Sequence, residues 1–222
     1  LGTSDEGREF NGTSDFIEVA FDASFQPLRK VTLSAWFKVA AFDGIDHVIA
    51  GNLNAGGYEL ALGNNTVEFR IESLGATQVA SFTSIGLAVD TWHHVAGVWD
   101  DGTIRLFVNG VEEINSIKNA TGTIDFTNSN SFNIGASSTA TTGQDGDFFQ
   151  GQIDEVAFWN TALSDTSIAE IYKRGDDDDK VFYDVDRPTI PVSLDIIYYN
   201  SLVSRANLTV TDCTGLDYII VT

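Results

Sequence analysis

The sequence is poor in cysteine, methionine and basic residues, and it lacks any long apolar run. Cys213 is the only cysteine, so no disulfide can form within the chain. No apolar stretch approaches the ~20 residues of a membrane helix, and no signal peptide opens the chain, so we expect no membrane insertion. Methionine is absent even at position 1, which indicates a processed product or a piece of a longer polypeptide.

The shortage of basic residues sets the charge of the chain. Lys and Arg number 12 against 32 Asp and Glu, which gives a net charge of −20 over 222 residues. Nucleic acids and anionic membranes need clustered Lys and Arg, so we expect neither to be a partner. A content of 43% hydrophobic and 11% aromatic residues excludes a disordered chain and is enough for a packed core.

Apolar and polar residues alternate over many short stretches, which is typical of half-buried β-strands. In the stretch 31–39 one face carries five apolar residues: Val31, Leu33, Ala35, Phe37 and Val39. Stretch 104–108 runs into Asn109-Gly110, a strong signal for a tight hairpin. Further strands are expected at 16–21, 47–51, 58–62, 66–72, 79–83, 92–99, 131–134 and 152–159. The sequence therefore predicts an all-β sandwich of two antiparallel sheets.

One short helix is expected after the last of these strands. Ser164 can cap its start, and Leu163 and Ile168 can form a hydrophobic staple across that start. Gly175 is expected to end it. We therefore predict a first domain at residues 1–175, an acidic linker at 176–180 and a small β-rich tail, or the start of a further domain, at 181–222.

Three stretches, in this order, resemble the laminin-G-like and concanavalin-A-like jelly-roll superfamily, which includes the pentraxins. They are FNGTSDFIEV at 10–19 leading to LSAWFK at 33–38, TWHHVAGVW at 91–99 followed by LFVNG at 106–110, and FQGQIDEVAFWNTALS at 149–164. The resemblance implies a two-sheet jelly roll whose rim loops bind carbohydrate, protein or calcium. It does not imply one function, because this fold hosts lectins, adhesion modules, hydrolases and virion proteins.

The resemblance also implies a metal position. In related jelly rolls a structural calcium ion often lies between the approach to the first strand and an acidic residue of the last strand. Asp154 would supply the carboxylate here, and the region of Asn11 would complete the shell. Two interpretations stay open: one structural calcium ion at this place, or an Asp154 side chain that accepts hydrogen bonds from loop amides.

Candidate ligand-binding residues come from aromatic side chains close to polar loops, because sugars stack on aromatic faces and bond to polar groups. Trp99 leads directly into Asp100 and Asp101, so its surroundings are expected to reach the rim. Tyr58 follows the flexible loop 52–57 and is the other candidate. Core packing is the alternative for both rings.

Catalysis is not expected. Hydrolases of this superfamily place paired carboxylates on one strand face, whereas Asp154 and Glu155 are adjacent and so point to opposite faces. His93 and His94 point opposite ways as well, which suits a framework role better than a metal site.

We therefore expect a non-catalytic binding or adhesion module of an extracellular or surface-exposed protein, which recognises a glycan or protein ligand. The first alternative is a virion or other assembly protein whose residues 181–222 dock onto neighbouring subunits. The second is a glycoside hydrolase.

Overall fold

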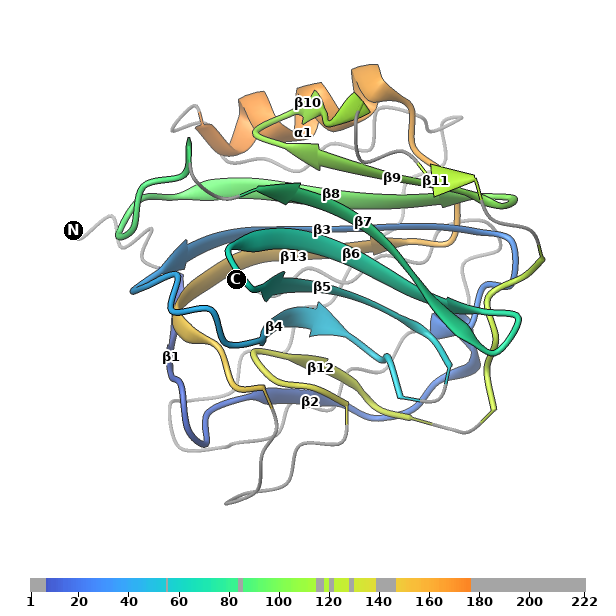
Figure 1. The fold of residues 1–222 in the computed structure, drawn as a ribbon, viewed down its shortest axis with the longest axis horizontal. Helices are drawn as coiled ribbons and strands as arrows, with labels where there is room; N and C mark the ends of the chain where they lie inside the picture. The colour runs from blue at the N-terminus through green and yellow to red at the C-terminus, as the bar shows by residue number, and fades with distance from the viewer. Residues whose placement is uncertain are drawn as a thin grey trace, which may run out of the picture.

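The computed structural model describes residues 7–54, 56–83, 86–114, 118–119, 122–127, 130–138 and 147–176. They form two antiparallel sheets packed face to face, with one helix beside the outer face of the first sheet (Figure 1). The predicted all-β jelly roll is confirmed. Asp176, the first residue of the predicted linker, is the last residue of the helix. The rest of the linker and the predicted tail, with Cys213, lie outside the described residues.

Sheet A has seven strands and sheet B has six. In sheet A the order is β1 (Arg8–Asn11), β13 (Gln150–Trp159), β3 (Lys30–Val39), β8 (His93–Asp100), β9 (Thr103–Val108) and β10 (Val111–Glu112), and β11 (Lys118–Asn119) also pairs with β9. In sheet B the order is β2 (Ile17–Val19), β12 (Phe132–Ile134), β4 (His47–Gly51), β5 (Tyr58–Gly63), β6 (Thr66–Ser73) and β7 (Ala76–Thr83). β1 to β4 alternate between the two sheets, so short loops at the rim join the layers.

The apolar faces predicted from alternation meet between the sheets. The five apolar residues predicted for one face of β3 are all buried, and β6 alternates buried and half-buried residues along its whole length. The Asn109-Gly110 hairpin is confirmed, with φ angles of 49° and 74° that suit its tight turn. β1 was not predicted, because four residues are too few to show a period.

The helix α1 (Asp165–Asp176) covers part of the outer face of sheet A, beside β9 and β10 in Figure 1. Ser164 caps it as predicted, because its Oγ accepts a hydrogen bond of 3.1 Å from the backbone N–H of Ser167. Leu163 and Ile168 pack together in a second apolar cluster with three residues of β8 and β9: Ala96, Val98 and Phe107. The prediction that Gly175 ends the helix is wrong by one residue.

Among the described residues, no helix combines the length and hydrophobicity that a membrane crossing needs.

One glycine lets the two sheets approach closely. Gly97 lies on the core face of β8, and a Cβ added there would come within 2.1 Å of the ring of Phe69 from β6. Phe69 is fully buried, so it has little room to move away. The ring therefore packs directly against the backbone of the opposite sheet.

We expect Gly97→Ala to lower the free energy of unfolding by about 1–3 kcal/mol, because the added methyl overpacks the core. Denaturant unfolding measures this loss. Gly86→Ala is the matched control, since no atom lies within 4 Å of a Cβ added at Gly86. If both variants unfold at the same denaturant concentration, Gly97 does not set the packing of the sheets.

Candidate ligand-binding site

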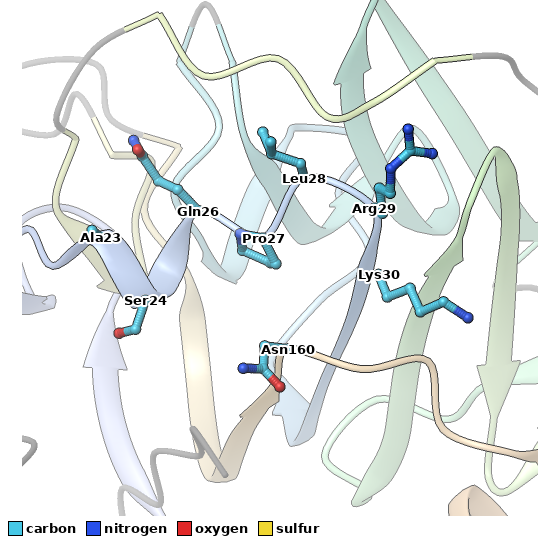
Figure 2. A pocket seen from close by; sticks show the side chains of 8 residues that line it. All are labelled: Ala23, Ser24, Gln26, Pro27, Leu28, Arg29, Lys30 and Asn160. Carbon is cyan, nitrogen blue, oxygen red and sulfur yellow. The ribbon is translucent and has the colours of Figure 1, made fainter. Parts of the chain in front are cut away.

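A pocket of about 510 Å³ opens at one end of the sandwich (Figure 2). The 3₁₀ helix η1 (Ala23–Phe25), the start of β3 with the residues before it, and the segment after β13 form its walls. Its lining residues are Ala23, Ser24, Gln26, Pro27, Leu28, Arg29, Lys30 and Asn160. The pocket thus offers an apolar strip of Pro27 and Leu28 between polar side chains.

A cap and contacts with the core fix the position of η1. Asp22 caps η1 by accepting a hydrogen bond of 2.8 Å from the N–H of Ser24. Phe25 is buried and stacks on Phe132 of β12, with 5.2 Å between the ring centroids. The hydroxyl of Tyr58 donates a hydrogen bond of 3.0 Å to the carbonyl oxygen of Phe25. The left wall in Figure 2 is therefore tied to both the core and β5.

A side-chain clamp positions Asn160 on the opposite wall. The hydroxyl of Thr32 donates to the carbonyl oxygen of Thr161 at 2.8 Å and accepts from the N–H of Leu163 at 3.0 Å. These two bonds fix the chain where it leaves β13 and turns toward α1. Asn160 directly precedes this clamp, so its amide is presented from a fixed backbone.

Two ion pairs join the pocket to the hairpin between β8 and β9. Arg29 Nη1 lies 2.6 Å from Asp101 Oδ1, and Lys30 Nζ lies 2.8 Å from Asp100 Oδ1. Its hydrogen bond to Asp100 raises the pKa of Lys30. All four side chains are about half exposed or more, so solvent screens the pairs and they add little to stability. The pairs do fix the positions of the Arg29 and Lys30 side chains at the pocket.

The structure separates the four predicted ligand residues into two groups. Asp100 and Asp101 lie beside the pocket, although neither lines it, and each is already paired with a cation. Trp99 and Tyr58 are fully buried, so neither ring offers a face to a ligand. The interpretation of these two rings as a sugar platform is therefore corrected: they are core residues, and Tyr58 supports η1.

Asp154 and Asn11 are not brought together. β1 places Asn11 opposite Gln150, four residues along β13 from Asp154, or about 13 Å at the usual rise of a strand. The amide oxygen of Asn11 accepts three backbone hydrogen bonds, from residues 13 to 15. Asp154 Oδ1 accepts one from the N–H of Glu155 at 2.8 Å, inside a β-bulge. In the described parts of the chain no three His, Cys, Asp or Glu residues group as metal ligands. Calcium stays a prediction.

A second polar cluster lies on the outer face of sheet B. Arg70 on β6 contacts three carboxylates: Glu68 at 2.7 Å, Asp46 at 2.9 Å and Glu59 at 3.2 Å. The side chain of Glu59 is 6% exposed, so a ligand in solvent cannot reach it. The cluster joins β5, β6 and the loop before β4 in one ionic network.

Burial changes the proton affinity of Glu59. Desolvation raises the pKa of Glu59 to about 7, and Arg70 opposes this rise. Arg70 does not prevent it, because the guanidinium lies closer to Glu68 and Asp46 and shares its charge among three acids. The free-energy cost of burying the charged Glu59 carboxylate therefore exceeds the attraction that it gains from Arg70.

Sequence reasoning missed both the pocket and this network. A signal for the pocket was present, because Arg29 and Lys30 are adjacent cations in a chain with only 12. Glu68 and Arg70 are two residues apart in the predicted strand 66–72, so alternation puts both side chains on one face. The contacts with Glu59 and Asp46 depend on the pairing of strands, which alternation does not give.

Glu59→Gln is expected to remove a pH dependence from stability. Between pH 4.5 and 7 the unfolded chain gives up this proton before the folded one does. Native Glu59 therefore costs stability as the pH rises, by about 3 kcal/mol in total. Denaturant unfolding at a series of pH values should show the wild type losing stability relative to the variant over this range.

Glu72→Gln is the control for this experiment. It removes a carboxylate from β6, the strand next to that of Glu59, that takes no part in the Arg70 network and bonds to Thr77 instead. If Glu59→Gln and the wild type run parallel between pH 4.5 and 7, Glu59 is not the titrating group.

The fold has relatives of known structure. Domains LG4-5 of the mouse laminin α1 chain align with a TM-score of 0.54 at 13% identity, over 72% of this chain and 44% of the laminin chain. A heptameric SAP-like pentraxin from Limulus polyphemus aligns with a TM-score of 0.52 at 15% identity, over 74% and 80% of the two chains. Domain 4 of AbnA, an extracellular arabinanase of Geobacillus stearothermophilus solved with arabinotriose, aligns with a TM-score of 0.55 at 17% identity, over 77% and 78%.

These similarities establish the fold and leave the ligand open, because all three identities are low. The chain spans less than half of the laminin structure. No curated protein matches the chain in sequence. A family model, however, matches residues 11–169, which is most of the chain and nearly all of its described part. The chain therefore belongs to the concanavalin A-like lectin/glucanases superfamily, in its laminin-G-type branch.

Proposed function

We propose that the chain is a non-catalytic binding module of an extracellular or surface-exposed protein, and that it binds a glycan in the pocket between η1 and Asn160. The observation that carries this proposal is the make-up of the pocket walls. Hydroxyl and amide side chains at Ser24, Gln26 and Asn160 surround the apolar Pro27 and Leu28.

This combination matches the surface of a sugar. A sugar ring presents hydroxyl groups at its edge and C–H groups on its faces, so a glycan site needs polar groups around an apolar patch. Leu28 is 56% exposed and can pack against the C–H face of a sugar. Each wall is fixed before a ligand arrives, by Tyr58 on one side and Thr32 on the other. A fixed site loses little entropy on binding.

Two observations support binding without catalysis. The acids beside the pocket, Asp100 and Asp101, are each held by a cation at 2.6–2.8 Å rather than directed into the pocket. Glu59, whose pKa burial raises to about 7, belongs to the buried network on the outer face of sheet B. A glycosidase needs two carboxyl groups that both reach one glycosidic bond.

Asn160→Ala and Gln26→Ala should each weaken glycan binding about 5- to 10-fold, because each removes about 1 kcal/mol of hydrogen bonding. We would screen the domain on an array of neutral and acidic oligosaccharides that includes arabinotriose, a ligand found in a structure of the same fold. Calorimetry with the strongest binder would then give the affinity of each variant.

Asn64→Ala is the matched control, because it removes an exposed amide from the turn between β5 and β6, at the opposite end of the sandwich. An array without any binder, or a binder indifferent to both pocket variants, would contradict glycan binding at this pocket. Release of shorter sugars from a bound oligosaccharide would contradict the non-catalytic part of the proposal.

A further inference from the structure

Three polar side chains between α1 and sheet A have no hydrogen-bond partner among the described residues. They are the hydroxyl of Ser34, the indole N–H of Trp36 and both ring nitrogens of His94. Ser34 and His94 are 1% exposed and Trp36 is 7% exposed. Strand pairing sets Trp36 opposite His94, so these side chains share the outer face of the sheet. Native proteins pair nearly all buried polar groups, so this cluster is an exception that calls for a reason.

His94 lies in a group of three rings, one of which belongs to the helix. Its ring centroid is 5.5 Å from that of Trp36 on β3 and 6.1 Å from that of Tyr172 on α1. Trp36 and Tyr172 stack on each other at 5.5 Å, with 21° between their planes. A Cβ added at Gly110 would lie 2.9 Å from the Cβ of Tyr172, so the turn after β9 closes the group.

The surroundings of His94 favour the neutral imidazole. β3 contributes Trp36, and the turn after β9 contributes Asn109, whose side-chain oxygen accepts a bond from the backbone N–H of His94. α1 contributes Tyr172, and Lys173 follows it exposed. In the strand register Asp154 of β13 lies opposite Trp36 of β3, and His94 of β8 lies opposite Trp36 on its other side, so Trp36 stands between Asp154 and His94. Burial lowers the pKa of His94 to about 3, and no charged group contributes to that shift.

The two ends of α1 are held by different interactions. At its start, Arg105 Nη1 lies 2.6 Å from Asp165 and 3.3 Å from Glu112, while Leu163 and Ile168 pack in the second apolar cluster. In its last two turns, Tyr172 packs over His94 and Trp36. The start of α1 is therefore held by ion pairs and apolar contacts, whereas its C-terminal turns pack against the buried, neutral imidazole of His94.

We propose that α1 is a pH-sensitive cover on sheet A, whose C-terminal turns detach when His94 takes up a proton. The detached imidazole is solvated and binds a proton near pH 6.5, so acid stabilises the open form. Below that pH the ratio of open to closed molecules rises about tenfold per unit, or about 100-fold between pH 6.5 and 4.5. Release exposes the Trp36 face of sheet A.

Hydrogen–deuterium exchange on the full chain tests this proposal, with wild type and His94→Phe compared between pH 7.5 and 4.5. The ratio of the two exchange rates at each amide cancels the intrinsic effect of pH on exchange. We expect this ratio to rise about 100-fold for the amides of Ile171 to Lys173 and to stay constant for those of β3 and β8. His93→Gln is the control, because that ring lies on the core face beside Phe37 and bonds to the carbonyl oxygen of Ala88.

Tyr172→Ala keeps the proposal testable if His94→Phe does not fold. It removes the ring that covers His94, so the last turns should exchange rapidly at both pH 7.5 and pH 4.5. The proposal is overturned if acid leaves the exchange of α1 unchanged, or if β3 and β8 lose protection together with α1, which would indicate global unfolding. It is also overturned if His93→Gln removes the response.

Discussion

The space between the two sheets has to be filled by side chains that fit one another, and aromatic rings fill much of it where the pocket forms. Tyr58 from sheet B and Phe158 from sheet A stack at 6.0 Å with 13° between their planes, and Phe25 of η1 packs against Phe158 at 5.4 Å. Because Phe25 belongs to this layer, the backbone on either side of it has a fixed path. The pocket wall is thus an outward extension of the core. A change in core packing at Phe25 would move binding groups that no ligand touches.

The outer faces of the sheets carry buried polar groups of two kinds. On sheet B, three carboxylates share one guanidinium, so one acid is left with a raised pKa. On sheet A, an imidazole without a partner lies under a helix. The effects of pH are opposite in sign: rising pH costs stability at Glu59, and falling pH costs stability at His94. These two groups together favour a stability maximum between mildly acidic and neutral pH.

Strand periodicity predicted the sandwich because it reports which residues face the core. β3 and β6 show this most clearly, and the cap at Ser164 placed the start of α1 correctly. The site was less predictable for a physical reason. Trp99 and Tyr58 precede or follow polar loops, but their own positions on their strands point inward. The pocket is assembled from residues more than 130 apart, Ser24 and Asn160, and no local pattern in the sequence records that contact.

The pairing of β1 with β13 also decides how the domain responds to a pulling force. Arg8 lies opposite Ile153 and Asn11 lies opposite Gln150, so β1 runs back along the start of β13. Tension applied between Arg8 and Trp159 loads the hydrogen bonds of this pair one after another, beginning at Arg8, because both points lie toward the same end of the ladder. A short strand loaded in this way separates at low force. We therefore expect β1 to separate from β13 before the packed core opens.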